Sequence, residues 1–166
     1  MLIVFLSAAL LADHAPSVVT PASVGRMIDR YGARQTVQRL SNVVPNDTHT
    51  DFGDFDKVLD GIASGDAHWL RLVPRLAPGT DAGTGESLPI VIAEALPKNP
   101  VGVLRLIKRD ASWIDACGYP MIEPTRKEMR AYFKAAIPAV NSVHDPALQS
   151  VKRICLSELL KAQHTP

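Results

Sequence analysis

The middle of the chain, residues 54–107, is a succession of short apolar patterns, each closed by glycine, proline or asparagine. In the first pattern the apolar residues recur at intervals of three and four, which places them on one face of a helix. These residues are Phe55, Val58, Leu59 and Ile62. Helices of roughly 8–14 residues are only marginally stable alone in water, so they must pack on one another. The expected fold is all-α: a compact bundle or short solenoid of antiparallel helical hairpins, with about seven or eight short helices.

Polar capping residues followed by proline mark several helix starts. Thr20-Pro21, Asn99-Pro100 and Asp145-Pro146 each combine an N-cap with a proline suited to the first turn. Thr125 and Glu128 form a capping box ahead of another apolar stripe. Three further N-caps are expected: Asp54, Asp66 and Thr84. Because helical spacing follows each of these residues, we expect a helix to begin at each one.

Other stretches leave the secondary structure open. Leu88–Ala93 is apolar throughout, which fits a helix in the middle of a bundle and also a short buried strand; helix is the favoured interpretation. Residues 80–86 and 108–124 are rich in small and polar residues or in glycine and proline. We expect both to be loops. Prolines 74, 89 and 138 fall inside helical patterns and should kink or shorten those helices.

Composition limits the classes of partner. A chain of 166 residues buries enough surface to form a core without a metal ion. The net charge is only +1, no long basic run occurs, and aromatic residues make up 5% of the chain. We therefore expect no nucleic-acid partner. No apolar run reaches the length of a membrane-spanning helix, so no span is expected in the mature protein.

The N-terminus is strongly apolar from Leu2 to Ala12. A run of this length suits the hydrophobic region of a signal peptide or a buried core segment. Small residues follow it, whereas the basic residues that usually precede such a region are missing. We expect residues 1–15 to be a signal peptide and residues 16–166 to form a single helical domain. The protein would then be periplasmic or secreted; the alternative is a core segment in a cytoplasmic protein.

The chain has two cysteines, Cys117 and Cys155, which are 38 residues apart. An even cysteine count together with an export-like N-terminus favours a disulfide between them. Two unrelated buried thiols are the alternative. The five histidines are scattered and no Cys-x-x-Cys motif is present, so neither a metal site nor a cofactor is expected.

Candidate site residues are few and weak. Glu94 is the one charge in an otherwise apolar pattern. It is expected to be exposed at a groove, to pair with an arginine, or to be buried with a raised pKa, which would mark a site. The arginines considered as its partners are Arg71, Arg75 and Arg105. Asp66 and His68 could bring a carboxylate to an imidazole, although a helix cap beside a surface histidine is the favoured interpretation.

The glycine-rich stretch 79–86 precedes a helix start, where free backbone N–H groups could hold an anion. It lacks the motifs of phosphate-binding loops, and Asp81 and Glu86 would repel phosphate. A flexible connection between helices is therefore the favoured interpretation. No residue stands out as catalytic.

The sequence supports two hypotheses about function. The favoured one is an exported helical protein that binds another protein, such as an inhibitor, an adaptor or an immunity-type protein that neutralises an enzyme. Helical hairpins in series form surfaces suited to protein partners. The alternative is a small enzyme or ligand binder with an inter-helix pocket around Glu94, Asp66 and His68.

Overall fold

The computed structural model describes residues 18–41, 53–118 and 124–164. These ranges are all-α and contain no strand, as expected. The α-helices are α1 (Pro21–Leu40), α2 (Asp54–Ala63), α3 (Ala67–Leu76), α4 (Ala82–Ala95), α5 (Pro100–Arg109), α6 (Arg126–Asn141) and α7 (Gln149–His164). Three 3-10 segments join them: η1 (Ala77–Gly79), η2 (Ala111–Cys117) and η3 (Pro146–Leu148). The expected signal peptide, residues 1–15, lies outside the described residues.

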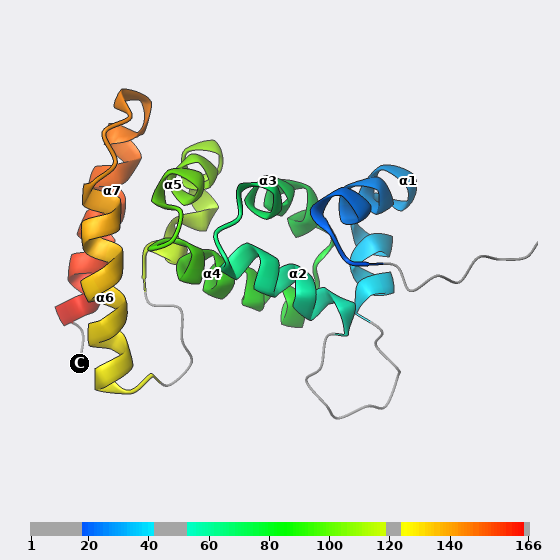
Figure 1. Cartoon of the computed structure of the whole chain (residues 1–166), viewed down its shortest axis with the longest axis horizontal. Coiled ribbons are helices and arrows are strands. Elements are labelled where there is room, and N and C mark those ends of the chain that lie inside the picture. Colours follow the sequence, from blue (N-terminus) through cyan, green and yellow to red (C-terminus); the bar gives the residue numbers. More distant parts are fainter. Residues whose placement is uncertain (1–17, 42–52, 119–123, 165–166) are drawn as a thin grey trace, which may run out of the picture.

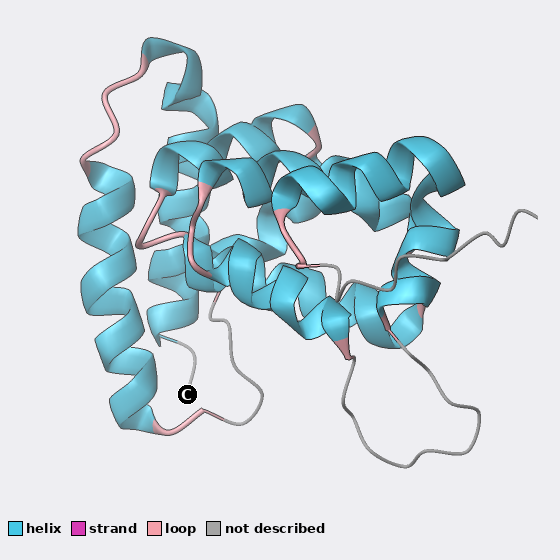
Figure 2. Cartoon of the chain, turned by 45° about the vertical axis from the view of Figure 1, so that its right-hand side comes forward, coloured by secondary structure: helices cyan, strands magenta, loops and turns pink. Residues whose placement is uncertain are grey.

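The helices form two rows with a hairpin at one end. The first row contains α1, α3 and α5, and the second row contains α2 and α4 (Figure 1). Neighbours within each row pack on one another, and the rows pack against each other. The hairpin of α6 and α7 closes the end next to α5, as the turned view also shows (Figure 2). This arrangement is a short solenoid of helical hairpins.

Helices of the first row run in the same direction. Just ahead of α5, the Asn99 side chain donates a hydrogen bond of 2.8 Å to the carbonyl oxygen of Gly65, just ahead of α3. One turn further along, the backbone of Gly102 lies against the Leu70 side chain. On the other side of α3, Arg75 pairs with Asp29 of α1. Residues at the same height in successive helices are therefore neighbours.

One continuous apolar cluster fills the space between the rows and reaches into the hairpin. The expected face of α2 is buried in it, and so is the corresponding face of α3. Its largest fully buried side chains include Phe55, Ile62, Leu76, Leu88, Ile92, Leu104, Phe133 and Leu159. Ile154 of α7 is three residues from Val151, a helical spacing, yet it is 51% exposed. The stripe runs through Val151, Cys155 and Leu159, and position 154 falls beside it.

Helix starts agree with the sequence at most caps and differ at two. Gly53 rather than Asp54 is the N-cap of α2. Asp81 rather than Thr84 is the N-cap of α4, and the helix therefore begins at Ala82. The prediction of a loop over residues 80–86 is wrong, because most of these residues are helical. Asp81 and Thr84 form a reciprocal capping box, which satisfies the first amide groups and outweighs the low helix propensity of the glycines.

Two other uncertain stretches are helical. Residues 88–93 lie inside α4, which confirms the helix interpretation over the strand. Part of the loop expected over residues 108–124 is the 3-10 segment η2, whose first amides are capped by Asp110. The last helix begins with the 3-10 turn η3 before α7 proper. The prolines at 74, 89 and 138 all lie within helices that continue past them.

A glycine bends the first helix. Gly32 has φ 78° and ψ 166°, a conformation outside the helical region that other residues rarely adopt. The bend places Ala33 beside Gly79 of η1, and a Cβ atom at Gly79 would overlap the backbone of Ala33. The absence of a side chain at position 79 therefore allows η1 to touch α1.

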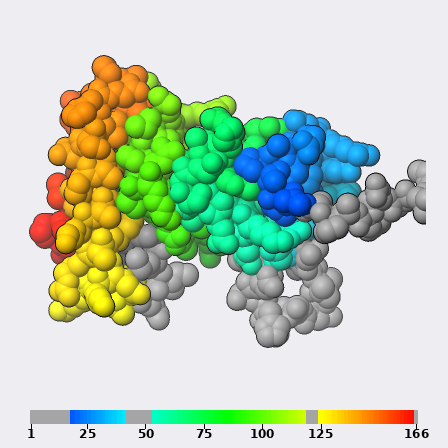
Figure 3. Space-filling model, in the orientation of Figure 1, coloured from blue at the N-terminus to red at the C-terminus, as the bar shows by residue number. Residues whose placement is uncertain are grey.

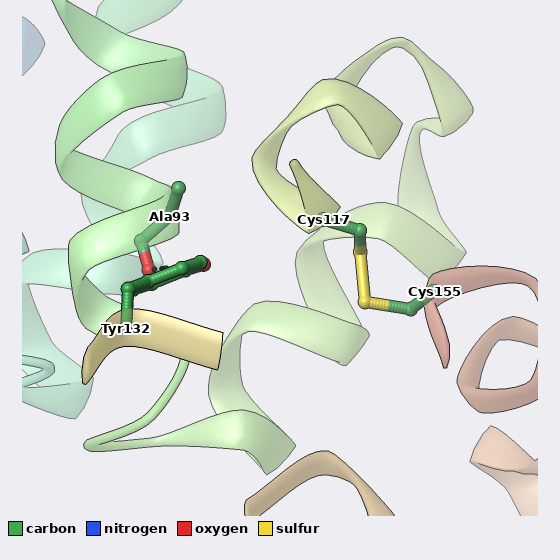
Figure 4. The surroundings of a disulfide bond; sticks show 4 residues. All are labelled: Ala93, Cys117, Tyr132 and Cys155. Atoms are coloured by element: carbon green, nitrogen blue, oxygen red, sulfur yellow. Dashed lines mark hydrogen bonds between the residues drawn. A yellow bond between two sulfur atoms is a disulfide. The ribbon is translucent and has the colours of Figure 1, made fainter. Parts of the chain in front are cut away.

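The expected disulfide is present. Cys117 at the end of η2 and Cys155 in α7 are both fully buried, and their Cα atoms are 5.2 Å apart (Figure 4). Because η2 packs on α4 and α5, the bond ties the C-terminal hairpin to the two rows.

Removing the disulfide is predicted to destabilise the protein by about 4 kcal/mol, because it frees a long loop in the unfolded chain. The loop spans 38 residues. The measurement is urea unfolding of the oxidised protein with and without reductant. The double variant Cys117→Ala with Cys155→Ala should unfold at the midpoint of the reduced protein in either condition. Equal midpoints for oxidised and reduced wild-type protein would contradict the prediction.

Candidate functional site

Asp66 acts as a helix cap. Its carboxylate accepts hydrogen bonds from the backbone N–H groups of His68 and Trp69, at 2.7 and 3.2 Å. The bonds from the Trp69 and His68 amides hold the pKa of Asp66 below its usual value. The imidazole of His68 turns instead to Arg71, whose guanidinium donates to Nδ1 at 2.8 Å. This is the arrangement of a cap beside a surface histidine that the sequence favours.

Glu94 lies in α4 and is half-buried. The arginines considered as its partners bind elsewhere: Arg71 to His68, Arg75 to Asp29 and Arg105 to Asp145. Glu94 instead lies near Tyr132, whose hydroxyl donates to the Ala93 carbonyl oxygen at 3.2 Å (Figure 4). Burial, and to a smaller degree the charge of Glu94, raise the pKa of Tyr132. None of the grooves that Asp66 or His68 lines includes Glu94.

Asp81 and Glu86 belong to the first turns of α4. The Asp81 carboxylate accepts hydrogen bonds from the backbone N–H and hydroxyl of Thr84, at 3.0 and 2.8 Å. These two bonds lower the pKa of Asp81. Glu86 is exposed. The Thr84 amide, one of those that could have held an anion, is thus capped by the chain's own carboxylate.

The most distinctive surface is a basic one on the first row, and we call it the arginine face. It comprises five exposed arginines: Arg26, Arg71, Arg75, Arg105 and Arg109. They line two adjoining grooves, one of about 500 Å³ between α1 and α3 and one of about 330 Å³ between α3 and α5. Arg71 lines both. The three helices adjoin along the upper half of the molecule in Figure 3.

A repeated pattern produces this face. Arginine, two apolar residues, any residue and a second arginine occur once in each helix of the first row, at residues 26–30, 71–75 and 105–109. Arginines four apart share one side of a helix, while the apolar pair points toward the core. In α3 and α5 that pair is fully or almost fully buried. In α1 the second arginine, Arg30, lies by the ring of Tyr31, and Asp29 lines the groove instead.

Counter-charges neutralise only part of the face. Arg75 pairs with Asp29 at 2.5 Å, and Arg105 pairs with Asp145 at 3.4 Å. Arg26 and Arg109 make no hydrogen bond or ion pair with any residue that the structure describes. A positive excess therefore gathers here, on a chain whose net charge is only +1.

The floor of the grooves is apolar and close to the helix backbone. Leu72 and Gly25 contribute to the first groove, and Leu70, Leu106 and Gly102 to the second. The two glycines let neighbouring side chains lie close to the helix backbone, Leu70 at Gly102 and Leu72 with Arg75 at Gly25. A ligand bound here would meet guanidinium groups along the rims and aliphatic carbon beneath.

Sequence reasoning missed the arginine face. It tested arginines 71, 75 and 105 only as partners of Glu94 and searched for basic runs rather than basic helix faces. One signal was available: Leu70–Arg75 reads LRLVPR, and 34 positions further on Leu104–Arg109 reads LRLIKR. A repeat of that length is typical of stacked helical hairpins, which would have placed both arginine pairs on one side.

Neither models of known protein families, nor curated proteins, nor solved structures match this chain. Within the described residues, no group of histidine, cysteine, aspartate or glutamate is arranged to hold a metal ion. No helix in those ranges is long and apolar enough to cross a membrane. The arginine face is the site on which a functional argument can be built.

Replacing both capping carboxylates, Asp66→Asn with Asp81→Asn, is predicted to make the protein less sensitive to acid. Both pKa values are lowered in the folded state. Their stabilising effect is therefore complete above the unfolded value near 3.8 and is lost as pH falls through the folded value. Asparagine caps equally well without ionising. The free energy of urea unfolding, measured from pH 7 down to acid, should fall less steeply in the variant.

The matched control is Asp66→Ala with Asp81→Ala. It should lower the free energy of unfolding at neutral pH by about 1 kcal/mol per cap, because alanine offers no acceptor. Identical acid dependence in the asparagine variant and the wild-type protein would show that these carboxylates do not contribute.

Proposed function

We propose that this protein is an exported helical domain that binds another protein through the arginine face. The observation that carries the proposal is the pair of adjoining grooves whose rims are lined by exposed arginines of three parallel helices. Arginine is enriched in protein interfaces and binds carboxylates through two parallel hydrogen bonds. An inhibitor, adaptor or immunity-type protein would use such a surface.

Export is supported by two independent features. The Cys117–Cys155 disulfide is the kind of bond that persists in oxidising compartments. The apolar segment Leu2–Ala12 has the length of a signal-peptide core. Together they favour a periplasmic or secreted protein.

A small-ligand binder or enzyme is the second candidate. It is favoured by the placement of His68 beside Arg71 in the first groove, where an imidazole and guanidinium groups could meet one anionic molecule. The groove is open and its neighbouring carboxylate, Asp66, is engaged by backbone amides. This arrangement suits binding of a surface better than enclosure of a substrate.

Export predicts a processed, oxidised product. The complete chain, expressed in a host with secretion machinery, should be recovered from the periplasm or medium without its N-terminal apolar segment. Intact-mass analysis should place the new N-terminus at or close to residue 16, and a thiol-reactive dye should find no free thiol at Cys117 or Cys155. A cytoplasmic product with Met1 in place and two reactive thiols would contradict export.

The binding proposal predicts that one charge reversal abolishes partner capture and another does not. The test variant is Arg71→Glu with Arg105→Glu. It reverses the charge of one residue that lines both grooves and of one that lines the second groove. The control is Arg130→Glu with Lys134→Glu, an exposed basic pair on α6 whose reversal changes the net charge by the same amount. The measurement is quantitative mass spectrometry of proteins cross-linked to each form in the exported fraction of its native host.

The same protein partner should be recovered with wild-type protein and control and lost with the test variant. Circular dichroism and thermal unfolding must first show that both variants fold like the wild type. Equal capture by the test variant would overturn the arginine face as the binding surface.

A further inference from the structure

We propose that the arginine face receives an acidic polypeptide segment in an extended, polyproline-like conformation, which crosses α1, α3 and α5 with a carboxylate at every third residue. This inference rests on the proposed function and names the chemistry of its partner.

Three arginines form a line across the helices. Arg26 and Arg71 line the first groove, and Arg71 and Arg105 line the second, so the three follow one another from α1 to α5. Packed helices are separated by about 8–10 Å. Arg75 and Arg109 repeat the line one turn further along α3 and α5. A segment that crosses the helices therefore meets a helix that carries an arginine about every 8–10 Å.

That spacing selects one backbone conformation. A polyproline helix has three residues per turn and rises about 3.1 Å per residue, so every third side chain points the same way at intervals of about 9 Å. An extended β-strand presents same-side residues about 7 Å apart. A helical ligand would present residues on one side at about 5–6 Å. Of the three conformations, the polyproline-like segment therefore fits the spacing of the arginine-bearing helices best.

Groove chemistry favours a polypeptide over other polyanions. The side chains of the two grooves include no phenylalanine, tyrosine or tryptophan on which bases could stack. Asp29 and Asp145 lie among the arginines and would repel a continuous phosphate backbone. The accessible apolar lining suits the proline and aliphatic side chains that would lie between carboxylates; it consists of Pro21, Ala22, Ala67 and Pro74.

The decisive experiment compares peptides of equal composition. A fluorescein-labelled peptide with five repeats of Glu-Pro-Ala carries carboxylates at every third residue. Its control has the same residues with the five glutamates in one block. Fluorescence anisotropy at fixed ionic strength should show tighter binding of the repeated peptide by about tenfold, the value expected when one or two charge-assisted contacts are lost. Equal or tighter binding of the block peptide would overturn the proposed spacing.

Charge reversal gives a second and independent readout. Arg71→Glu with Arg105→Glu should lose the Glu-Pro-Ala peptide and gain affinity for a Lys-Pro-Ala peptide of the same length. The α6 pair, Arg130→Glu with Lys134→Glu, should retain the wild-type preference. A test variant that folds normally and still prefers the glutamate peptide would overturn the assignment of the site.

Other polyanions are tested in the same assay. Labelled oligodeoxythymidine and vesicles of phosphatidylserine should bind more weakly than the Glu-Pro-Ala peptide at physiological salt, and tighter binding of either would overturn a polypeptide ligand. Failure of this proposal is distinguishable from failure of the proposed function. A protein partner that binds the arginine face with a folded domain or a helix of its own would support the proposed function. The same result would contradict the proposal that the ligand is an extended segment.

Discussion

Burial of one apolar cluster between two rows of helices is the interaction on which the rest of the structure depends. Three of the helices in the rows, α2, α3 and α5, have only ten residues each. Such helices persist because each one lays an apolar side against the other row. With their apolar sides committed to the core, α1, α3 and α5 leave polar sides free to face outward together. The arginine face forms because these three outward sides lie next to one another.

Local signals predicted much of this fold because they act within a few residues. The caps at Thr20, Asp66, Asn99 and Thr125 all formed as expected, since each pairs a side chain with amides of its own helix. The start of α4 was misplaced because Asp81 and Thr84 could be ranked as caps only by knowing which pair would bond. The exposure of Ile154 could not be read from the sequence, because the orientation of α7 is set by its contact with α6 and by the buried Cys155.

The candidate site was less accessible to sequence reasoning for a physical reason. Arg26, Arg71 and Arg105 lie far apart along the chain and come together only because alternate helices stack in parallel. A search for basic runs detects charges that are neighbours in sequence, whereas this surface collects one or two charges from each helix. Glu94 was a candidate site residue because it is an isolated charge in an apolar pattern. In the structure it is half-buried near Tyr132 and does not line the two grooves. The 34-residue repeat links the arginines of α3 and α5, whereas Arg26 lies outside it because it precedes Arg71 by 45 residues.

The parallel stacking in the first row also bears on how such a chain could grow. Each hairpin touches only its neighbours, and residues 70–75 and 104–109 repeat the same arrangement of buried leucines and outward arginines. Duplication of one such unit in the gene would insert another helical hairpin and leave the disulfide-linked C-terminal end unchanged. Each added hairpin would lengthen the binding surface by one helix, so the protein would bind a correspondingly longer ligand. Specificity for ligand length could then evolve through the number of repeats, without a change in the residues of a pocket.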